Sequence, residues 1–289
     1  MTILITAASG ALGHLVVESL IARGVEPSNI VAGARTPTKA ASLAERGVAI
    51  VELDYDAPAT IEAAFAGVDR VLLISGSEVG KRAAQHQAVI DAAVRAGVQQ
   101  LAYTSLARVE QSSLTLAPEH LATERAIQAS GLPATILRND WYAENYAANI
   151  DQAAATGVLL SATQGGRVAA AARADYAEAA AVALIGDAHI GKTYELGGDP
   201  VTYDEIAAAI GRVVGRDVVH QDVSAADFTA ALESAGLDAG TIAFLVGLDA
   251  GIAAGDLDIE DPTLTQLIGR PATPLHEALR AARAAAIAH

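Results

Sequence analysis

The sequence contains no cysteine, and aromatic residues make up only 4% of it. Without a thiol, the chain can form no disulfide, no thiolate nucleophile and no cysteine-ligated metal site. Basic residues are also scarce: 19 Lys and Arg stand against 34 Asp and Glu, giving a formal net charge of -15. Because this charge repels nucleic acid and anionic lipid, we expect neither as a partner. It also repels a dinucleotide phosphate, so basic residues close to a phosphate site are informative.

Long apolar runs are missing as well. No stretch is long enough to span a bilayer, and the first residues, MTILIT, carry no basic region before the apolar ones. We therefore expect a cytoplasmic protein without a signal peptide. Hydrophobic residues make up 52% of the 289 positions, which is enough to bury a large core.

Short apolar segments alternate with helical patterns through the first half of the chain. The expected strands cover residues 2–6, 30–34, 48–53, 71–74, 101–104 and 134–138. They are apolar throughout instead of alternating, which is typical of a parallel sheet covered on both faces. With right-handed crossovers, the pattern predicts an α/β fold with a doubly wound parallel sheet of the Rossmann type.

The regular alternation loosens after about residue 139. We expect an NAD(P)-binding domain over residues 1–150 and a smaller, mostly helical substrate or lid region over residues 151–289. A strand near 193–196 is expected to return to the sheet. Further on, Thr202 and Glu205 have the spacing of a capping box, which predicts that a helix begins there.

The first expected strand runs into the small residues AASGALG and then into a helix. In this context the amides at the helix start and the helix dipole favour a pyrophosphate. Gly10 would let the phosphates approach and Gly13 would let the helix pack on the strand, whereas Ala7 stands where the motif prefers its first glycine. The residues predicted to contact the cofactor here are Thr6, Ala8, Ser9, Gly10, Ala11, Leu12 and Gly13. An ordinary tight turn is the alternative.

Arg35 ends the second expected strand, roughly 20 residues beyond the turn, where an acid would bind the ribose 2′-hydroxyl of NAD. An arginine can pair with a 2′-phosphate instead, and Lys39 lies one helical turn further on. The pair favours NADP(H) over NAD(H), with NAD(H) and a merely solvated arginine left open. Asp54, after the third strand, would flank the adenine or simply form a turn.

Polar residues also follow the fourth, fifth and sixth expected strands. Ligands of such sheets bind outside the carboxyl ends of the strands, so these loops should converge on the nicotinamide. The predicted cofactor contacts are Ser75, Gly76, Ser77, Thr104 and Asn139, and the predicted acceptor pocket consists of Glu78, Ser105, Trp141 and Tyr142. For Trp141, the only tryptophan of the chain, core packing is the alternative.

The tyrosine and lysine that short-chain dehydrogenases usually carry after the fifth strand are absent. His120 and Glu124 occupy their places, so no phenol–ammonium pair can protonate an alkoxide. His120 is a weak candidate for a catalytic acid, and no other catalytic residue and no metal site is expected. Alternatively, the two side chains only lie on one helix face.

With these residues the sequence resembles the NmrA-like family of atypical short-chain dehydrogenases/reductases, and within it the bacterial NAD(P)H:quinone oxidoreductases of type 2 and the triphenylmethane reductases. The resemblance rests on ITAASGALGH, LLISGSEVGKRAAQH, AYTSL, LAPEHLATE, LRNDWYAENY, RADYAEAA, KTYELGGD and QLIGRP, which extend from residue 3 to about residue 271. It implies a Rossmann domain with a small lid, NADPH as hydride donor, and quinone reduction without flavin or a Tyr/Lys dyad.

Three functions stay open at this point. The first is an NADPH-dependent reductase of a quinone or a similar flat conjugated acceptor, in which positioning does most of the catalysis. The second is a non-catalytic NADP-sensing regulatory protein. The third is a tailoring hydroxylase or reductase acting on aromatic polyketide quinones. A homodimer also stays open.

Overall fold

The structure, a computed structural model, describes residues 1–287 and confirms the predicted doubly wound α/β fold. Its main sheet has seven strands in the order β3-β2-β1-β4-β5-β6-β9, and all its neighbouring pairs are parallel. The strands are β1 (Ile3–Ile5), β2 (Ile30–Ala34), β3 (Ala49–Glu52), β4 (Arg70–Leu73), β5 (Gln100–Leu106), β6 (Ala134–Asn139) and β9 (Thr193–Leu196). The chain order reverses between β1 and β4, where a sheet of this kind opens a crevice for ligands.

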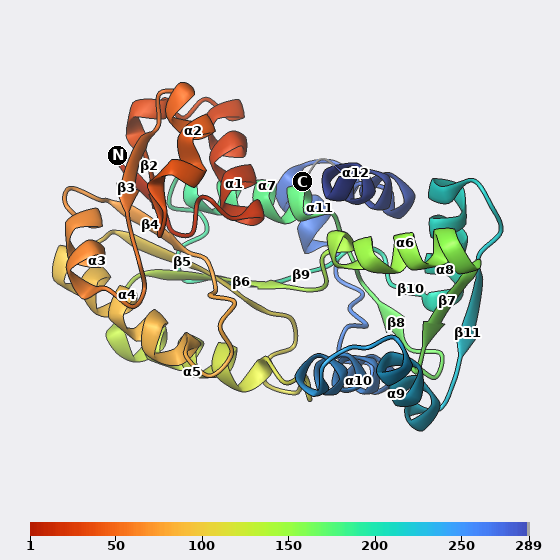
Figure 1. The fold of residues 1–289 in the computed structure, drawn as a ribbon. Coiled ribbons are helices and arrows are strands. Elements are labelled where there is room, and N and C mark those ends of the chain that lie inside the picture. The colour runs from red at the N-terminus through yellow and green to blue at the C-terminus, as the bar shows by residue number, and fades with distance from the viewer. Residues whose placement is uncertain (288–289) are drawn as a thin grey trace.

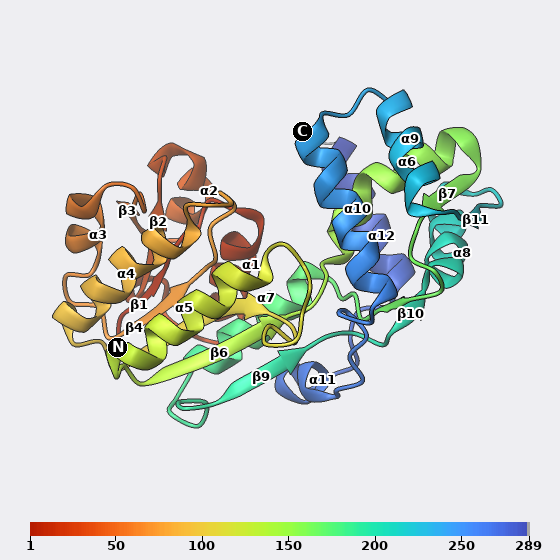
Figure 2. The same cartoon turned by 90° about the horizontal axis from the view of Figure 1, so that it is seen from below.

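Helices cover both faces of the sheet (Figures 1 and 2). Successive side chains of a strand point to opposite faces of the sheet. Ile3 and Ile5 of β1 therefore join the core under α1 and α7, whereas Leu4 joins the core under α3, α4 and α5. The helices of this part are α1 (Ala11–Ala22), α2 (Ala41–Glu45), α3 (Pro58–Ala64), α4 (Arg82–Ala96), α5 (Ala117–Ser130), α7 (Arg173–Leu184) and α11 (Thr263–Ile268), with short 3-10 turns at η1 (Pro27–Asn29) and η2 (Pro37–Ala40).

A second layer of structure lies beyond the carboxyl ends of β5 and β6 and has its own apolar core (Figure 1). Two small sheets brace it: β7 pairs with β11 in parallel, and β8 pairs with β10 in antiparallel fashion. Its elements are η3 (Ala143–Tyr146), α6 (Ala147–Thr156), β7 (Val158–Ser161), β8 (Arg167–Val168), β10 (Val201–Thr202), α8 (Tyr203–Val214), β11 (Val219–Asp222), α9 (Ala225–Ser234), α10 (Ala239–Ala253) and α12 (Leu275–Ile287). The predicted capping box of Thr202 and Glu205 is confirmed at the start of α8.

The chain runs into this second layer, returns to the sheet with α7 and β9, and then enters the second layer again. Helix α7 packs along α1, and β9 then pairs with β6 at the edge of the sheet. Residues on both sides of position 150 therefore build the sheet, and the two-domain boundary predicted there stays a prediction. Within residues 1–287, no helix combines the length and the apolar character needed to cross a membrane.

Candidate cofactor and acceptor site

A cavity of about 500 Å³ opens at the carboxyl edge of the sheet, where the strand order reverses. This volume lies in the range of typical ligand pockets. The cavity is lined by Ala7, Ser9, Gly10, Ala11, Leu12, Gly13, Arg35, Thr36, Lys39, Leu53, Asp54, Tyr55, Ile74, Ser75, Gly76, Ser77, Glu78, Gln85, Tyr142 and Arg173. The structure thus brings together most of the residues that the sequence suggested for the cofactor.

The turn after β1 forms one wall of the cavity. Ala7 has a φ of 48°, in the left-handed region that favours glycine, and its carbonyl accepts a 2.9 Å hydrogen bond from the Gly10 amide. A Cβ atom on Gly13 would lie 2.6 Å from that carbonyl oxygen, so only glycine lets α1 start this close to the strand. Gly10 provides no side-chain cap for α1, which leaves the amides of its first turn available to an anion in the cavity.

Basic side chains gather at one end of the cavity. Arg35, at the end of β2, and Lys39, in η2, both belong to its lining, as does Asp54. The Arg35 guanidinium lies 3.0 Å from a carboxylate oxygen of Glu78, and the other oxygen lies 2.9 Å from the ammonium group of Lys81. Glu78, predicted for the acceptor pocket, thus lies against Arg35, which was suggested for the 2′-phosphate, and against Lys81, which was not.

Two buried side chains of α4 hold the segment after β4 in place. The Gly76 amide donates to Nε2 of His86 at 3.0 Å, and the Gly76 carbonyl accepts from Nε of Arg82 at 2.7 Å. His86 is fully buried, and burial, with the nearby charge of Arg82, lowers its pKa to about 3. Its ring is therefore neutral at physiological pH, with Nε2 as acceptor and Nδ1–H facing the Thr123 hydroxyl at 2.9 Å. The sequence analysis missed this clamp, although both side chains lie in the stretch GKRAAQH.

Tyr142 and Arg173 also belong to the lining of the cavity. The guanidinium carbon of Arg173 lies 5.0 Å from the centre of the Tyr142 ring, a cation–π arrangement. Both carboxylate oxygens of Glu144 lie 3.0 Å from the Arg173 backbone amide, which fixes the start of α7. Arg173 was not among the predicted site residues. The signal for it was an arginine opening the stretch RADYAEAA in a chain with few basic residues.

Several predicted contacts lie beneath the cavity or beside it. Thr6 is fully buried, and its hydroxyl accepts hydrogen bonds from the Ile74 amide at 2.9 Å and the Tyr55 hydroxyl at 2.5 Å. Thr104, only 2% exposed, accepts a hydrogen bond from the Ser75 amide at 2.9 Å. Ala8 and Asn139 are buried as well. These side chains support the lining residues without belonging to them.

Trp141 lies outside the cavity. It lines a crevice of about 10 Å³, too small for a ligand, together with side chains of α10 and of the loop before α5. Its neighbours there are Leu106, Leu114, Thr115, Leu116, Phe244 and Leu248. This position suits the packing alternative, in which the indole joins the second layer to the sheet.

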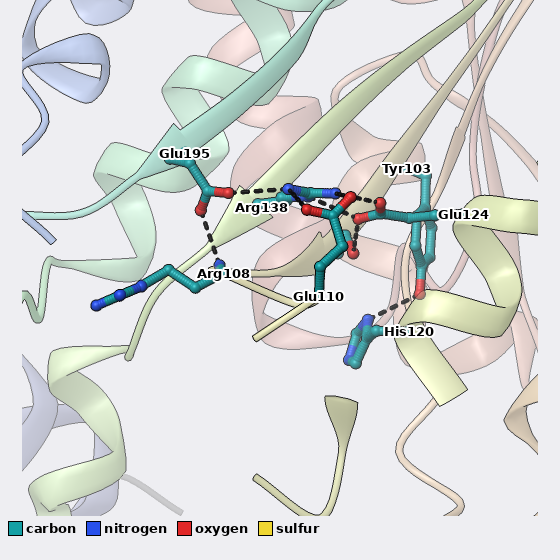
Figure 3. A network of polar contacts seen from close by, with 8 residues as sticks. Tyr103, Arg108, Glu110, His120, Glu124, Arg138 and Glu195 are labelled. Atoms are coloured by element: carbon teal, nitrogen blue, oxygen red, sulfur yellow. Dashed lines mark hydrogen bonds and ion pairs between the residues drawn. The ribbon is translucent and has the colours of Figure 1, made fainter. Parts of the chain in front are cut away.

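A polar network at the carboxyl ends of β5 and β6 surrounds Arg138 (Figure 3), and it includes Ser105. The Ser105 hydroxyl donates to Glu124 at 2.5 Å, and the same carboxylate pairs with the Arg138 guanidinium at 2.6 Å. Arg138 also pairs with Glu110 at 3.0 Å and Glu195 at 3.1 Å. Three carboxylates thus pair with one largely buried guanidinium, and none of these residues belongs to the lining of the cavity.

His120 lies next to this network and does not line the cavity (Figure 3). Its Nδ1 lies 2.8 Å from the Tyr103 hydroxyl, and only 5% of the residue is exposed. Burial lowers its pKa to about 3, with smaller contributions from Arg82 and His86. At neutral pH the ring is uncharged, so it holds no proton ready for transfer to an acceptor.

Comparison with known proteins gives consistent results. The model of the NmrA-like family matches residues 1–249. Quinone oxidoreductase 2 of Escherichia coli K12 is 46% identical over 278 residues, covering 96% of this chain and 97% of the relative. A crystal structure of an NADPH-dependent quinone oxidoreductase from Escherichia coli, complexed with NADPH, superimposes with a TM-score of 0.92 and covers 96% of this chain and 98% of that one. The Citrobacter sp. triphenylmethane reductase complexed with NADP(H) is 36% identical, with a TM-score of 0.91 over 97% of this chain and 100% of that one.

Proposed function

The chain belongs to the NmrA-like family, and on that premise we propose that it is an NADPH-dependent reductase. It passes hydride to a quinone or a similar flat conjugated acceptor, without flavin and without a Tyr/Lys dyad. The proposal is supported by the relative of 46% identity, whose name is quinone oxidoreductase 2, and by the similar structures solved with NADPH or NADP(H).

The observation that carries the proposal is the fit of the cavity to a dinucleotide with a third phosphate. Gly10 and Gly13, whose Cβ atoms would meet the Ala7 carbonyl oxygen, let the turn pack closely on the start of α1, and the uncapped amides of α1 suit the pyrophosphate. Arg35 and Lys39 provide charge for the 2′-phosphate at one end, and Asp54 lies near enough to flank the adenine. When bound, NADPH supplies the hydride.

Other residues of the cavity lining have the features needed for the acceptor. The Tyr142 ring offers a flat surface, and the Arg173 guanidinium over it is a cation that would stabilise the negative charge appearing on an acceptor oxygen. Ser75, Gly76 and Ser77 also line the cavity, and the buried clamp on Gly76 holds this segment in place. The proton that completes the hydroquinone comes from water, since neither buried histidine is protonated at neutral pH.

Anaerobic oxidation of NADPH by menadione tests the proposal. We expect one NADPH consumed per quinone reduced, by protein that shows no flavin absorbance and gains nothing from added FMN. If NADPH binds but no quinone accelerates its oxidation, the protein is an NADP-sensing regulator. In a parallel assay in air, oxygen uptake together with a hydroxylated product would support the tailoring alternative.

A further inference from the structure

We propose that Glu78 competes with the 2′-phosphate of NADPH for the cations at the mouth of the cavity, and thereby limits both the affinity for NADPH and the preference for it over NADH. The inference rests on the proposed function, because it concerns the cofactor of the same site. It assigns a role to the Glu78 carboxylate, which lies among residues suited to binding a phosphate.

The contact between Glu78 and Arg35 crosses the cavity. Arg35 follows β2, and Glu78 follows β4, while β1 lies between these two strands in the sheet. The turn suited to the pyrophosphate follows β1. The 3.0 Å bond between Arg35 and Glu78 therefore bridges the loops on either side of this turn, and both residues line the cavity.

Glu78 uses both of its carboxylate oxygens on cations. Oε1 accepts from Arg35 at 3.0 Å, and Oε2 lies 2.9 Å from Nζ of Lys81. Asp56 also faces Lys81, at 3.9 Å. Hydrogen bonds from Lys81 first and Arg35 second lower the pKa of Glu78, so the carboxylate is ionised at neutral pH. The Nη1 group of Arg35 is thus already paired, and a phosphate would have to compete with Glu78 for it.

The exchange is feasible because the pair is open to solvent. The Arg35 side chain is 67% exposed and that of Glu78 is 37% exposed, and ion pairs in such positions contribute little stability. A phosphate monoester carries a charge between about -1.5 and -2 near pH 7, more than one carboxylate. When the phosphate arrives, Glu78 either gives up Arg35 or stays close and repels the phosphate. NADH has no 2′-phosphate, so it does not meet this competition.

Glu78→Gln removes the negative charge of the side chain but keeps its shape, so it isolates the effect of that charge on phosphate binding. We expect Glu78→Gln to bind 2′,5′-ADP and NADPH about three- to tenfold more tightly, the scale of one or two exposed ion pairs. Binding of 5′-AMP and NADH should change less than about twofold. Glu62→Gln is a matched control, because Glu62 is an exposed carboxylate that pairs with Arg95 and does not line the cavity.

Isothermal titration of the full chain with 2′,5′-ADP and 5′-AMP measures this directly, without turnover. In an Arg35→Ala background, the gain from Glu78→Gln should fall below about twofold, because the contested cation is gone. Unchanged or weaker binding of 2′,5′-ADP by Glu78→Gln would overturn the inference, as would an equal gain for 5′-AMP. Failure of the unmodified protein to bind either NADPH or 2′,5′-ADP would instead overturn the proposed function, and the inference with it.

Discussion

Two halves of the same sheet edge differ in what their polar groups bind. Beyond β1, β2 and β4, backbone amides and the basic side chains of Arg35 and Lys39 line a cavity, and the exposed carboxylate of Glu78 pairs with Arg35. Beyond β5 and β6, by contrast, Arg138 is enclosed by three carboxylates, and Tyr103 bonds to His120 (Figure 3). Both halves are rich in polar residues, yet Arg138, His120 and their partners do not line the cavity.

The difference teaches that residue type at a strand end does not by itself define a site. A buried polar group needs a partner, and where the protein provides one the group stabilises the fold. Where it provides none, the group is available to a ligand. The predictions below test whether the residues beyond β5 and β6 act on stability and those beyond β1, β2 and β4 act on cofactor binding.

Arg138→Met should have the largest effect, and only on stability. The change leaves Glu124, whose side chain is 11% exposed, without its cation, and breaking a pair of this kind costs about 3–5 kcal/mol. Urea denaturation measures the loss, while the affinity for NADPH should stay within about twofold. Arg95→Met, which removes an exposed pair with Glu62, is the control and should cost less than about 1 kcal/mol. A loss for Arg138→Met no larger than that of the control would break the comparison.

Arg35→Ala should have the opposite profile, with a large effect on binding and little on stability. It removes the fork suited to the 2′-phosphate, so NADPH should bind about ten- to a hundredfold more weakly, the scale of a charge-assisted hydrogen bond. NADH should bind nearly as before. Parallel calorimetric titrations with the two cofactors check this, and equal losses for both would place the 2′-phosphate elsewhere.

His120→Gln tests whether His120, beyond β5 and β6, contributes to the stability of the fold. Burial lowers the pKa of His120 to about 3, below the value of about 6.5 in an unfolded chain, so the unfolded state binds more protons in between. The stability that the neutral ring provides is present above about pH 6.5 and is lost as the pH falls towards 3. Glutamine can still bond to Tyr103 but does not titrate, so the variant should lose less stability between pH 7 and pH 4.5 than the unmodified protein.

The same variant has a second use in kinetics. Because His120 does not line the cavity, turnover with menadione should stay within about threefold and vary weakly between about pH 6 and pH 8. A fall of several orders of magnitude would make His120 the catalytic acid and would move the network of the second half into the reaction.

Ala7→Gly should have the smallest effect. The φ of 48° at Ala7 is one that glycine adopts without a steric cost, so the substitution removes strain while adding freedom to the unfolded chain. We expect affinity for NADPH and stability to change by less than about 1 kcal/mol, with no loss of binding. Titration with NADP together with a urea curve decides it. A large loss would mean that the methyl group itself makes a contact that the cavity needs.

The site residues that could be predicted are those whose place is set by short-range spacing along the chain. Gly10, Gly13 and Arg35 could be assigned from the sequence because their spacing along one strand–turn–helix unit fixes their place. Arg173 could not, because it reaches the cavity from α7, after the chain has passed through the second layer. Tyr55 was missed for a similar reason: its ring lines the cavity only because its hydroxyl bonds to Thr6, 49 positions earlier.

Polar residues at strand ends were the least predictable from the sequence. Ser105 lies near the end of β5 and Trp141 follows β6, but neither lines the cavity: Ser105 bonds to Glu124, and Trp141 lies against α10. Their partners are set by side-chain packing between segments far apart in the sequence. The fold itself was predictable, since the apolar strands, their order and the helices between them are all encoded in patterns of a few residues.

The account depends most directly on the basic end of the cavity being a site for the 2′-phosphate. The decisive measurement is the pair of dissociation constants of NADPH and NADH for the unmodified protein, determined by calorimetry in the same low-salt buffer. The account predicts that NADPH binds at least about tenfold more tightly, which is about 1.4 kcal/mol. Equal affinity for the two cofactors would contradict it, because Arg35 and Lys39 would then make no use of the phosphate that distinguishes them.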